Sequence, residues 1–478
     1  MTTGASASFR DPENAAVAFE GTWYRVAAPE SAAALRALRA SDAYTRLTDA
    51  GSLVRFEPSD EATSAQVLAH YSATSGRTAP QGAQVFAVES VDLITYPWEW
   101  PNSMLQDAGR LTLAIRDELL GIGLDLKDAS AMNIAFRGMR PVLIDIGSVE
   151  AWRPNPSWNA ARQFIEHFIN PLAVGSGDRV TAADAWQLGA HRGLRSETAR
   201  ELMPKRQRRR MSLWLLQAST RPVASNKPSE TRFGKEAASN PDLALNATRG
   251  LGKRLRKQID ALTAKDHATT WQDYGSRAHY GSDDLDRKAG FARAFVQGRE
   301  ALVLDVGGND GFTGADLVRQ AGARVIVMDA DAGALDVLHR GLSGSSDLAT
   351  RMTPLLGDLT NLTPGSGLLD TEFASFVSRV RPTAVTCQAV LHHVVITQGV
   401  PMPLAVEALA RFGAPVQIEF ADENDEKVRI LLSQIPNWAG DYTTEALLAA
   451  MRTRFDHVEV AGTTSPTRVV VNGWNDPA

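Results

Sequence analysis

The sequence predicts an α/β fold for the C-terminal half of the chain, and an α+β fold for the N-terminal half. Two observations carry the first prediction. After residue 300, five short apolar runs alternate with segments of helical period, the pattern of parallel strands covered by helices on both faces. Near the C-terminus, two strand-like runs are separated by four residues, 463–466, too few for a helix. This last pair should therefore be antiparallel and form a hairpin at the edge of the sheet.

The expected strands follow one another in chain order. The five parallel strands are residues 301–306, 323–329, 352–358, 382–390 and 415–420. The edge hairpin is formed by residues 455–462 and 467–474. Ligands of open α/β sheets bind at the carboxyl ends of the strands, so the residues that end these runs are the first candidates for a site.

At 478 residues the chain is longer than a single hydrophobic core usually supports. Composition changes most clearly at residues 221–248, where Pro, Ser, Asn and charged residues displace the hydrophobic period. We therefore expect an N-terminal domain of residues 1–220, a linker of residues 221–248 and a C-terminal domain of residues 249–478.

Composition excludes several classes of partner. A net charge of −5, with 44% hydrophobic and 22% charged residues, indicates a globular protein without overall attraction to nucleic acid or anionic membranes. The basic run at residues 205–210 is expected to be a solvated helix face. No stretch approaches 18 consecutive apolar residues, the N-terminus lacks a secretion signal, and Cys387 is the only cysteine. These features predict a cytoplasmic protein without membrane contact and leave its oligomeric state open.

The most informative segment joins the first expected strand to the next helix. It contains Asp305, Gly307, Gly308, Asn309 and Gly311. Glycines allow positive φ angles and let the backbone approach a ligand closely. Their spacing differs from the GxGxxG pattern of dinucleotide sites, and no Gly-Lys-Ser/Thr follows as a phosphate-binding loop would require.

Polar residues also end the later strands. Asp329 closes the second run, where a carboxylate can accept hydrogen bonds from both hydroxyls of a ribose. Asp358 follows the third run and Gln388 lies at the end of the fourth. A strand-end carboxylate alone is weak evidence, but these residues in this order with the glycine turn indicate a nucleotide-like ligand.

The turn and the strand-end acids together resemble the S-adenosyl-L-methionine (SAM) motif DxGxxxG of class I methyltransferases. The resemblance implies a Rossmann-like domain with SAM as cofactor, and it implies that Asp358 lies near the adenine amino group. A doubly wound domain that binds another nucleotide is the alternative. Further phrases look like bacterial class I methyltransferases that include nodulation-associated proteins: YPWEW at 96–100, LKDASAMNIAF at 126–136, PVLIDIGSVE at 141–150, and EFADENDEKVRILL at 419–432. This wider resemblance implies methyl transfer to a small-molecule acceptor and names no acceptor.

Three residues are candidates for catalysis. His392 and His393 follow the fourth strand, where a histidine can take a proton from a hydroxyl or amine because its pKa lies near the working pH. Glu419 ends the fifth strand and is expected at the mouth of the site. Packing or helix capping by the histidines, and simple exposure of Glu419, are the alternatives. No metal site is expected.

The N-terminal half contains a second constellation. Asp128 and Asn133 have the spacing of a kinase catalytic loop, and Asp145-Ile146-Gly147 resembles the Asp-Phe-Gly element that holds magnesium. Lys127 departs from the usual triplet, and neither a glycine-rich loop nor a strand-borne lysine is visible upstream. We expect a kinase-like scaffold or acceptor-binding domain. The alternatives are a bifunctional, kinase-like phosphotransferase with an accessory SAM domain, and a non-catalytic SAM-binding protein.

Overall fold

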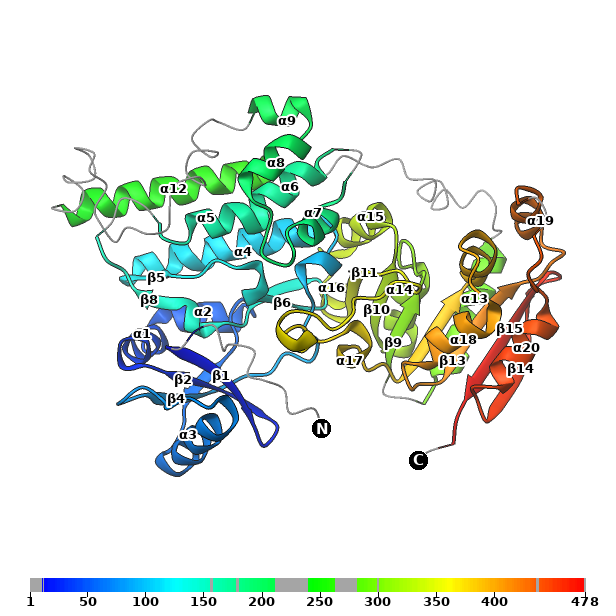
Figure 1. Cartoon of the computed structure of the whole chain (residues 1–478), viewed down its shortest axis with the longest axis horizontal. Coiled ribbons are helices and arrows are strands. Elements are labelled where there is room, and N and C mark those ends of the chain that lie inside the picture. Colours follow the sequence, from blue (N-terminus) through cyan, green and yellow to red (C-terminus); the bar gives the residue numbers. More distant parts are fainter. Residues whose placement is uncertain are drawn as a thin grey trace. The chain divides into compact units, whose positions relative to one another are not determined.

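The computed structural model describes residue 11 and residues 13–154, 158–177, 180–210, 240–262, 282–298, 301–435 and 438–476. The chain divides into two compact units. Unit 1 comprises Met1–Lys265 together with Ser366–Phe373, and unit 2 comprises Asp266–Gly365 and Ala374–Ala478. Figure 1 shows the elements of both units.

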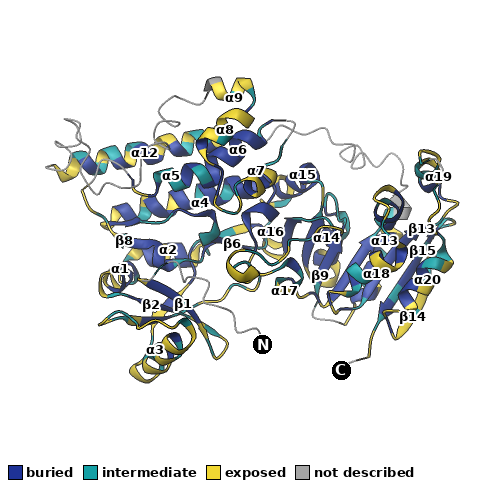
Figure 2. Ribbon diagram, in the orientation of Figure 1, coloured by how far each residue is buried: buried dark blue, intermediate teal, exposed yellow. Residues whose placement is uncertain are grey.

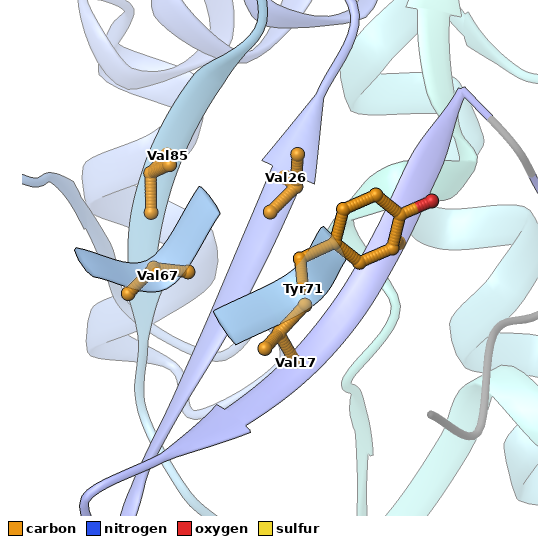
Figure 3. Packing of buried hydrophobic residues seen from close by; sticks show 6 residues of the cluster. Val17, Val26, Val67, Tyr71 and Val85 are labelled. Atoms are coloured by element: carbon orange, nitrogen blue, oxygen red, sulfur yellow. The ribbon is translucent and has the colours of Figure 1, made fainter. Parts of the chain in front are cut away.

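Unit 1 begins with a four-stranded antiparallel sheet in the order β1-β2-β4-β3. Its elements are β1 (Asn14–Phe19), β2 (Thr22–Ala27), α1 (Pro29–Arg39), α2 (Asp42–Asp49), β3 (Phe56–Pro58), α3 (Glu61–Ser75) and β4 (Gln84–Val88). Valines from β1, β2 and β4 pack against Val67 and Tyr71 of α3 (Figure 3). A two-residue turn, Glu20-Gly21, joins β1 to β2, and both of its φ angles are positive, at 48° and 79°.

The rest of unit 1 is mainly helical around two small strand pairs, β5 with β8 and β6 with β7. Its strands are β5 (Leu124–Leu126), β6 (Ile134–Arg137), β7 (Arg140–Leu143) and β8 (Val149–Ala151). Its helices are η1 (Pro97–Glu99), α4 (Asn102–Gly121), η2 (Ala131–Asn133), η3 (Ile146–Ser148), α5 (Ala161–Phe164), η4 (Ile165–Ile169), α6 (Asn170–Gly175), α7 (Ala182–Leu188), α8 (Ser196–Leu202), α9 (Lys205–Arg210), α12 (Pro241–Ala261) and η6 (Leu368–Asp370). Unit 1 is thus an α+β domain, as the sequence predicts.

The position of helix α12 differs from the expected domain division. Leu251, Leu255 and Ile259 repeat every four residues and form a buried stripe, which requires an apolar partner. Helix α4 of unit 1 is that partner: the amide nitrogen of Gln106 donates to the carbonyl oxygen of Ile259 at 2.7 Å. The division between the units therefore falls after residue 265 instead of residue 248. Residues 221–239 of the expected linker lie outside the described residues.

Unit 2 contains a seven-stranded sheet in the order β11-β10-β9-β12-β13-β15-β14 (Figure 1). The strands are β9 (Leu302–Val306), β10 (Arg324–Asp329), β11 (Met352–Leu356), β12 (Ala384–Gln388), β13 (Val416–Ala421), β14 (His457–Ser465) and β15 (Arg468–Trp474). The pairs among β9 to β13 are parallel, whereas β15 is antiparallel to both β13 and β14. The predicted parallel sheet with an antiparallel edge hairpin is confirmed.

Helices connect these strands and cover the sheet. They are α13 (Ser282–Val296), α14 (Phe312–Ala321), α15 (Ala332–Leu342), α16 (Ser346–Arg351), α17 (Phe376–Arg379), η7 (His393–Thr397), α18 (Met402–Ala410), α19 (Glu426–Ser433) and α20 (Thr444–Arg452). The parallel strands are almost entirely buried while the helices expose their outer faces (Figure 2). Strand order reverses between β9 and β12, which are neighbours, so the carboxyl ends of these two strands frame the natural position for a ligand. Within the described residues, no helix is both long and apolar enough to span a membrane.

Candidate cofactor and acceptor site

The glycine turn leads from β9 into α14 and packs closely against its neighbours. Gly307 has a φ of 68°, and a Cβ atom there would lie 2.2 Å from the Val390 side chain in the segment after β12. A Cβ atom on Gly308 would lie 2.7 Å from Oδ2 of Asp305. Gly311, with a φ of 74°, starts helix α14. Glycine is therefore required at these positions, and the turn brings bare backbone to the ligand edge of the sheet.

Asp329 holds the glycine turn from the adjacent strand. Its Oδ2 accepts a hydrogen bond of 2.9 Å from the backbone N–H of Asn309, and its Oδ1 accepts one of 2.8 Å from the N–H of Asp331. Burial raises the pKa of Asp329 above its usual value. A carboxylate has about four acceptor positions, so these two bonds leave capacity for hydroxyl groups of a ligand.

Asp305 lies beneath the turn and is fully buried. Its Oδ1 accepts a 2.8 Å hydrogen bond from the Thr386 hydroxyl on β12, but its Oδ2 has no hydrogen-bond partner among the described residues. Burial raises the pKa of this carboxyl to about 6. An unpaired buried acceptor is costly, so Oδ2 is a position where a ligand donor would be stabilised.

The two remaining cofactor candidates lie at neighbouring strand ends. Gln388 ends β12: its Oε1 accepts from the Thr313 hydroxyl on α14 at 2.9 Å, and its Nε2 donates to the carbonyl oxygen of Lys288 at 3.4 Å. Asp358 follows β11, and its Oδ1 accepts from both the N–H and the hydroxyl of Thr360 at 2.8 Å. Gln388 thus joins α13, β12 and α14 beside the glycine turn, whereas Asp358 orders the loop after β11.

His392 and His393 follow β12, through Ala389, a residue with a φ of 56°. The His392 side chain is 2% exposed, and neither ring nitrogen has a hydrogen-bond partner among the described residues. Burial, followed by the charges of His393 and Arg468, lowers the pKa of His392 to about 3. Burial also lowers the pKa of the half-buried His393 to about 4, and the two ring centroids are 4.0 Å apart. Both imidazoles are therefore neutral at pH 7.

Glu419 does not lie exposed at the mouth of the site. Its side chain is 2% exposed, its Oε2 is 2.8 Å from Nζ of Lys288, and its Oε1 accepts from the Thr464 hydroxyl at 2.7 Å. Arg468 of β15 is near the same carboxylate, at 3.9 Å, and is bound to Asp425 at 2.9 Å. Glu419 is thus part of a buried ion-pair network that ties α13 to the sheet.

Lys288 was not predicted from the sequence, although a signal was present. Ala292 and Phe295 follow it by four and seven residues and are buried, so Lys288 interrupts the apolar stripe of α13. A lysine on the buried face of a helix is rare unless it is paired.

In unit 1 the structure places the kinase-like residues close together. The amide nitrogen of Asn133 donates to Oδ1 of Asp128 at 3.2 Å. Burial raises the pKa of Asp128, and the charge of Asp145 adds to the shift. Asp145 itself pairs with Arg25 of β2 at 2.5 Å. Among the described residues, no group of three or more His, Cys, Asp or Glu side chains is placed to bind a metal ion.

Strand order, the edge hairpin and the glycine turn give unit 2 the Rossmann-like arrangement that the sequence predicts. No known protein-family profile matches the chain. The chain is 28% identical to the nodulation protein NoeA of Rhizobium meliloti (strain 1021) over 446 residues, which cover 93% of this chain and 90% of that protein. The chain is therefore related to a nodulation protein over nearly its whole length.

Solved methyltransferase structures resemble part of the chain. Magnesium protoporphyrin IX methyltransferase from Synechocystis PCC 6803, with bound SAH, is 14% identical, and the match covers 44% of this chain and 95% of that chain with a TM-score of 0.31. The bifunctional kinase-methyltransferase WbdD is 20% identical, and the match covers 43% of this chain and 41% of that chain with a TM-score of 0.28.

Proposed function

We propose that the protein is an enzyme that transfers a methyl group from SAM to a small-molecule acceptor, with unit 1 as scaffold or acceptor-binding domain. One observation carries the proposal: Asp329 at the end of β10 hydrogen-bonds the glycine turn after β9, at the point where strand order reverses. This arrangement joins a carboxylate suited to ribose hydroxyls to a stretch of accessible backbone.

Different residues at the carboxyl edge of the sheet would bind different groups of the cofactor. Asp329 and Asp358 would accept hydrogen bonds from the ribose and the adenine amino group, and the turn from Gly307 to Gly311 would face the ligand with its backbone. Oδ2 of Asp305 offers a buried acceptor for an ammonium group. When bound, SAM supplies a methyl group on a positively charged sulfur, which is a good leaving group.

His392 would bind the acceptor. Its two buried nitrogens without partners are suited to a hydroxyl or amine of the acceptor, and the neutral ring is able to accept the proton that this group loses on methylation. Alignment of the acceptor supplies most of the rate enhancement. His393 is the second candidate base. Glu419, with its charge balanced by Lys288, is better suited to holding α13 in place.

The test is native mass spectrometry of the full chain as purified, followed by calorimetric titration with SAM and with SAH. We expect one molecule of SAM or SAH per chain. A folded chain that binds neither would contradict the proposal, and SAM binding without turnover over a broad panel of acceptors would favour a non-catalytic SAM-binding protein.

A second candidate function is kinase-like nucleotide chemistry in unit 1. It is favoured by the contact between Asn133 and Asp128 and by the proximity of Asp145. Magnesium-dependent binding of ATP that is lost in Asp145→Asn, while SAM binding is retained, would support it.

A further inference from the structure

Arg25 is the only basic residue in the four-stranded sheet of unit 1, because strands β1, β2, β3 and β4 contain no other lysine or arginine. Its side chain is buried and points to Asp145. Asp145 forms the acidic centre of unit 1 together with Asp128 and Asn133. Nη2 of Arg25 lies 2.5 Å from Oδ1 of Asp145, and Nη1 donates to the carbonyl oxygen of Asn14 at 2.8 Å. Both terminal nitrogens of the guanidinium are thus held, whereas Nε has no hydrogen-bond partner among the described residues.

The backbone after Asp145 closes against this ion pair. The N–H of Gly147 donates to the same oxygen, Oδ1 of Asp145, at 3.2 Å. A Cβ atom on Gly147 would lie 2.9 Å from Cβ of Asn14 and 3.1 Å from Nη1 of Arg25. Oδ1 of Asp145 therefore already has two donors, and only a glycine leaves room for the guanidinium at this position.

The cation next to Asp128 in the sequence is also paired. Lys127 precedes Asp128, but its ammonium group is 3.2 Å from Asp11 and 3.8 Å from Glu13. The turn between β1 and β2 has only two residues, Glu20-Gly21, too short to wrap phosphates with backbone N–H groups. Phosphate binding in a kinase-like site needs a loop and a cation of this kind.

From this geometry we infer that Arg25 is the internal counter-ion of the acidic centre: its guanidinium takes the place that a divalent cation would need at Asp145. On this assignment the centre binds neither Mg²⁺ nor a magnesium-nucleotide complex in the wild type, so unit 1 does not transfer phosphate and the second candidate function is excluded. A divalent cation at Asp145 would meet a fixed positive charge a few ångströms away, in a partly buried position where water screens the repulsion less than in bulk solvent.

The test measures Mn²⁺ binding by electron paramagnetic resonance, with full-length protein, first without nucleotide and then with ADP. We expect no Mn²⁺ site that depends on Asp145 in the wild type. Arg25→Gln should bind Mn²⁺ without nucleotide on the order of tenfold more tightly or better, because a like charge has been removed. The double variant Arg25→Gln/Asp145→Asn should lose this gain.

Two outcomes would overturn the inference. One is Mn²⁺ and ADP binding by the wild type that is lost in Asp145→Asn, and the other is an Arg25→Gln variant that folds and gains no Mn²⁺ affinity. If Arg25→Gln does not fold, Asp145→Asn alone tests the inference, because it removes the negative charge that is paired with the Arg25 guanidinium. That variant should bind pyrophosphate in the presence of EDTA while the wild type does not, and equal binding by the two proteins would contradict the assignment. SAM affinity, measured in parallel, separates this result from the methyltransferase proposal.

Discussion

At the scale of residues, Asp305 and His392 are buried side chains at the carboxyl edge of the sheet in unit 2 whose polar atoms lack partners among the described residues. Oδ2 of Asp305 and both ring nitrogens of His392 have no hydrogen-bond partner there, although buried polar groups are normally paired. Asp305 lies on β9 just before the glycine turn, and His392 follows β12. Both residues therefore lie at the strand ends where the proposed cofactor and acceptor would meet. The structure thus indicates which groups a ligand would satisfy.

The first prediction concerns Asp329. Asp329→Ala removes the acceptor expected for the ribose and also the bond to the N–H of Asn309. SAM affinity should fall by about 1–3 kcal/mol, roughly 5- to 150-fold. Calorimetry on the folded variant measures this change, and Asp347→Ala, an exposed carboxylate on α16, is the matched control. An unchanged SAM affinity in Asp329→Ala would remove this residue from the cofactor site.

The second prediction concerns His392. A general base typically contributes about 10²–10⁴ in rate, and the low pKa of His392 makes it a weak base, so His392→Ala should lower kcat by about 10² with little change in SAM affinity. His392 is neutral well below pH 6.5, so kcat should not fall with histidine protonation between about pH 5 and 7. His457→Ala, at an exposed histidine of β14, is the control. Loss of SAM binding or of folding in His392→Ala would show that the residue is structural.

At the scale of elements, helix α13 is attached to the sheet through charge as well as apolar packing. Lys288 of α13 reaches Glu419 of β13, and Arg468 of β15 lies between Glu419 and Asp425, which caps α19. A buried network of this kind is costly to break because each lost partner leaves an uncompensated charge. It therefore constrains where α13 lies over the carboxyl edge of the sheet.

The third prediction tests this attachment. Lys288→Met leaves Glu419 buried without its cation and should lower the free energy of unfolding by about 3–5 kcal/mol. The double variant Lys288→Met/Glu419→Gln should recover part of that loss because the unpaired charge is gone. Denaturant titration measures both, with Arg287→Met on the exposed face of α13 as control. Equal stability of Lys288→Met and wild type would show that the ion pair is not formed in solution.

At the scale of the whole molecule, both units contain histidines that burial keeps neutral. Burial lowers the pKa of His167 in unit 1 to about 4, and it lowers the values of His392 and His393 in unit 2 to about 3 and 4. The Nδ1 atom of His167 lies 3.2 Å from both the hydroxyl of Ser130 and the N–H of Ala131, so the ring is part of the turn after Asp128. These histidines should therefore make the stability of each unit depend on pH.

The fourth prediction is the pH dependence of stability. Between about pH 6.5 and 4 the unfolded chain binds protons at these histidines while the folded chain does not, so their contribution is full above pH 6.5 and is lost as the pH falls. Asp305, whose folded pKa of about 6 is raised, acts in the opposite direction over nearly the same range. His167→Gln and His392→Gln should each flatten the acid side of the Tm curve, measured by calorimetry, whereas exposed His457→Gln should not. Parallel curves for all three variants would contradict the assigned shifts.

The sequence alone determined the sheet of unit 2 and its ligand edge. Apolar runs, helical periods and turn glycines are local signals, so strands β9 to β15, the turn at Gly307 and the strand-end carboxylates could all be expected from it. Only the tertiary structure decided that α12 packs in unit 1, that Glu419 pairs with Lys288, and that Arg25 pairs with Asp145 from 120 residues away. The reason is physical: burial of a helix face and the partner of a charge depend on distances in space between segments remote in sequence, which no local pattern contains.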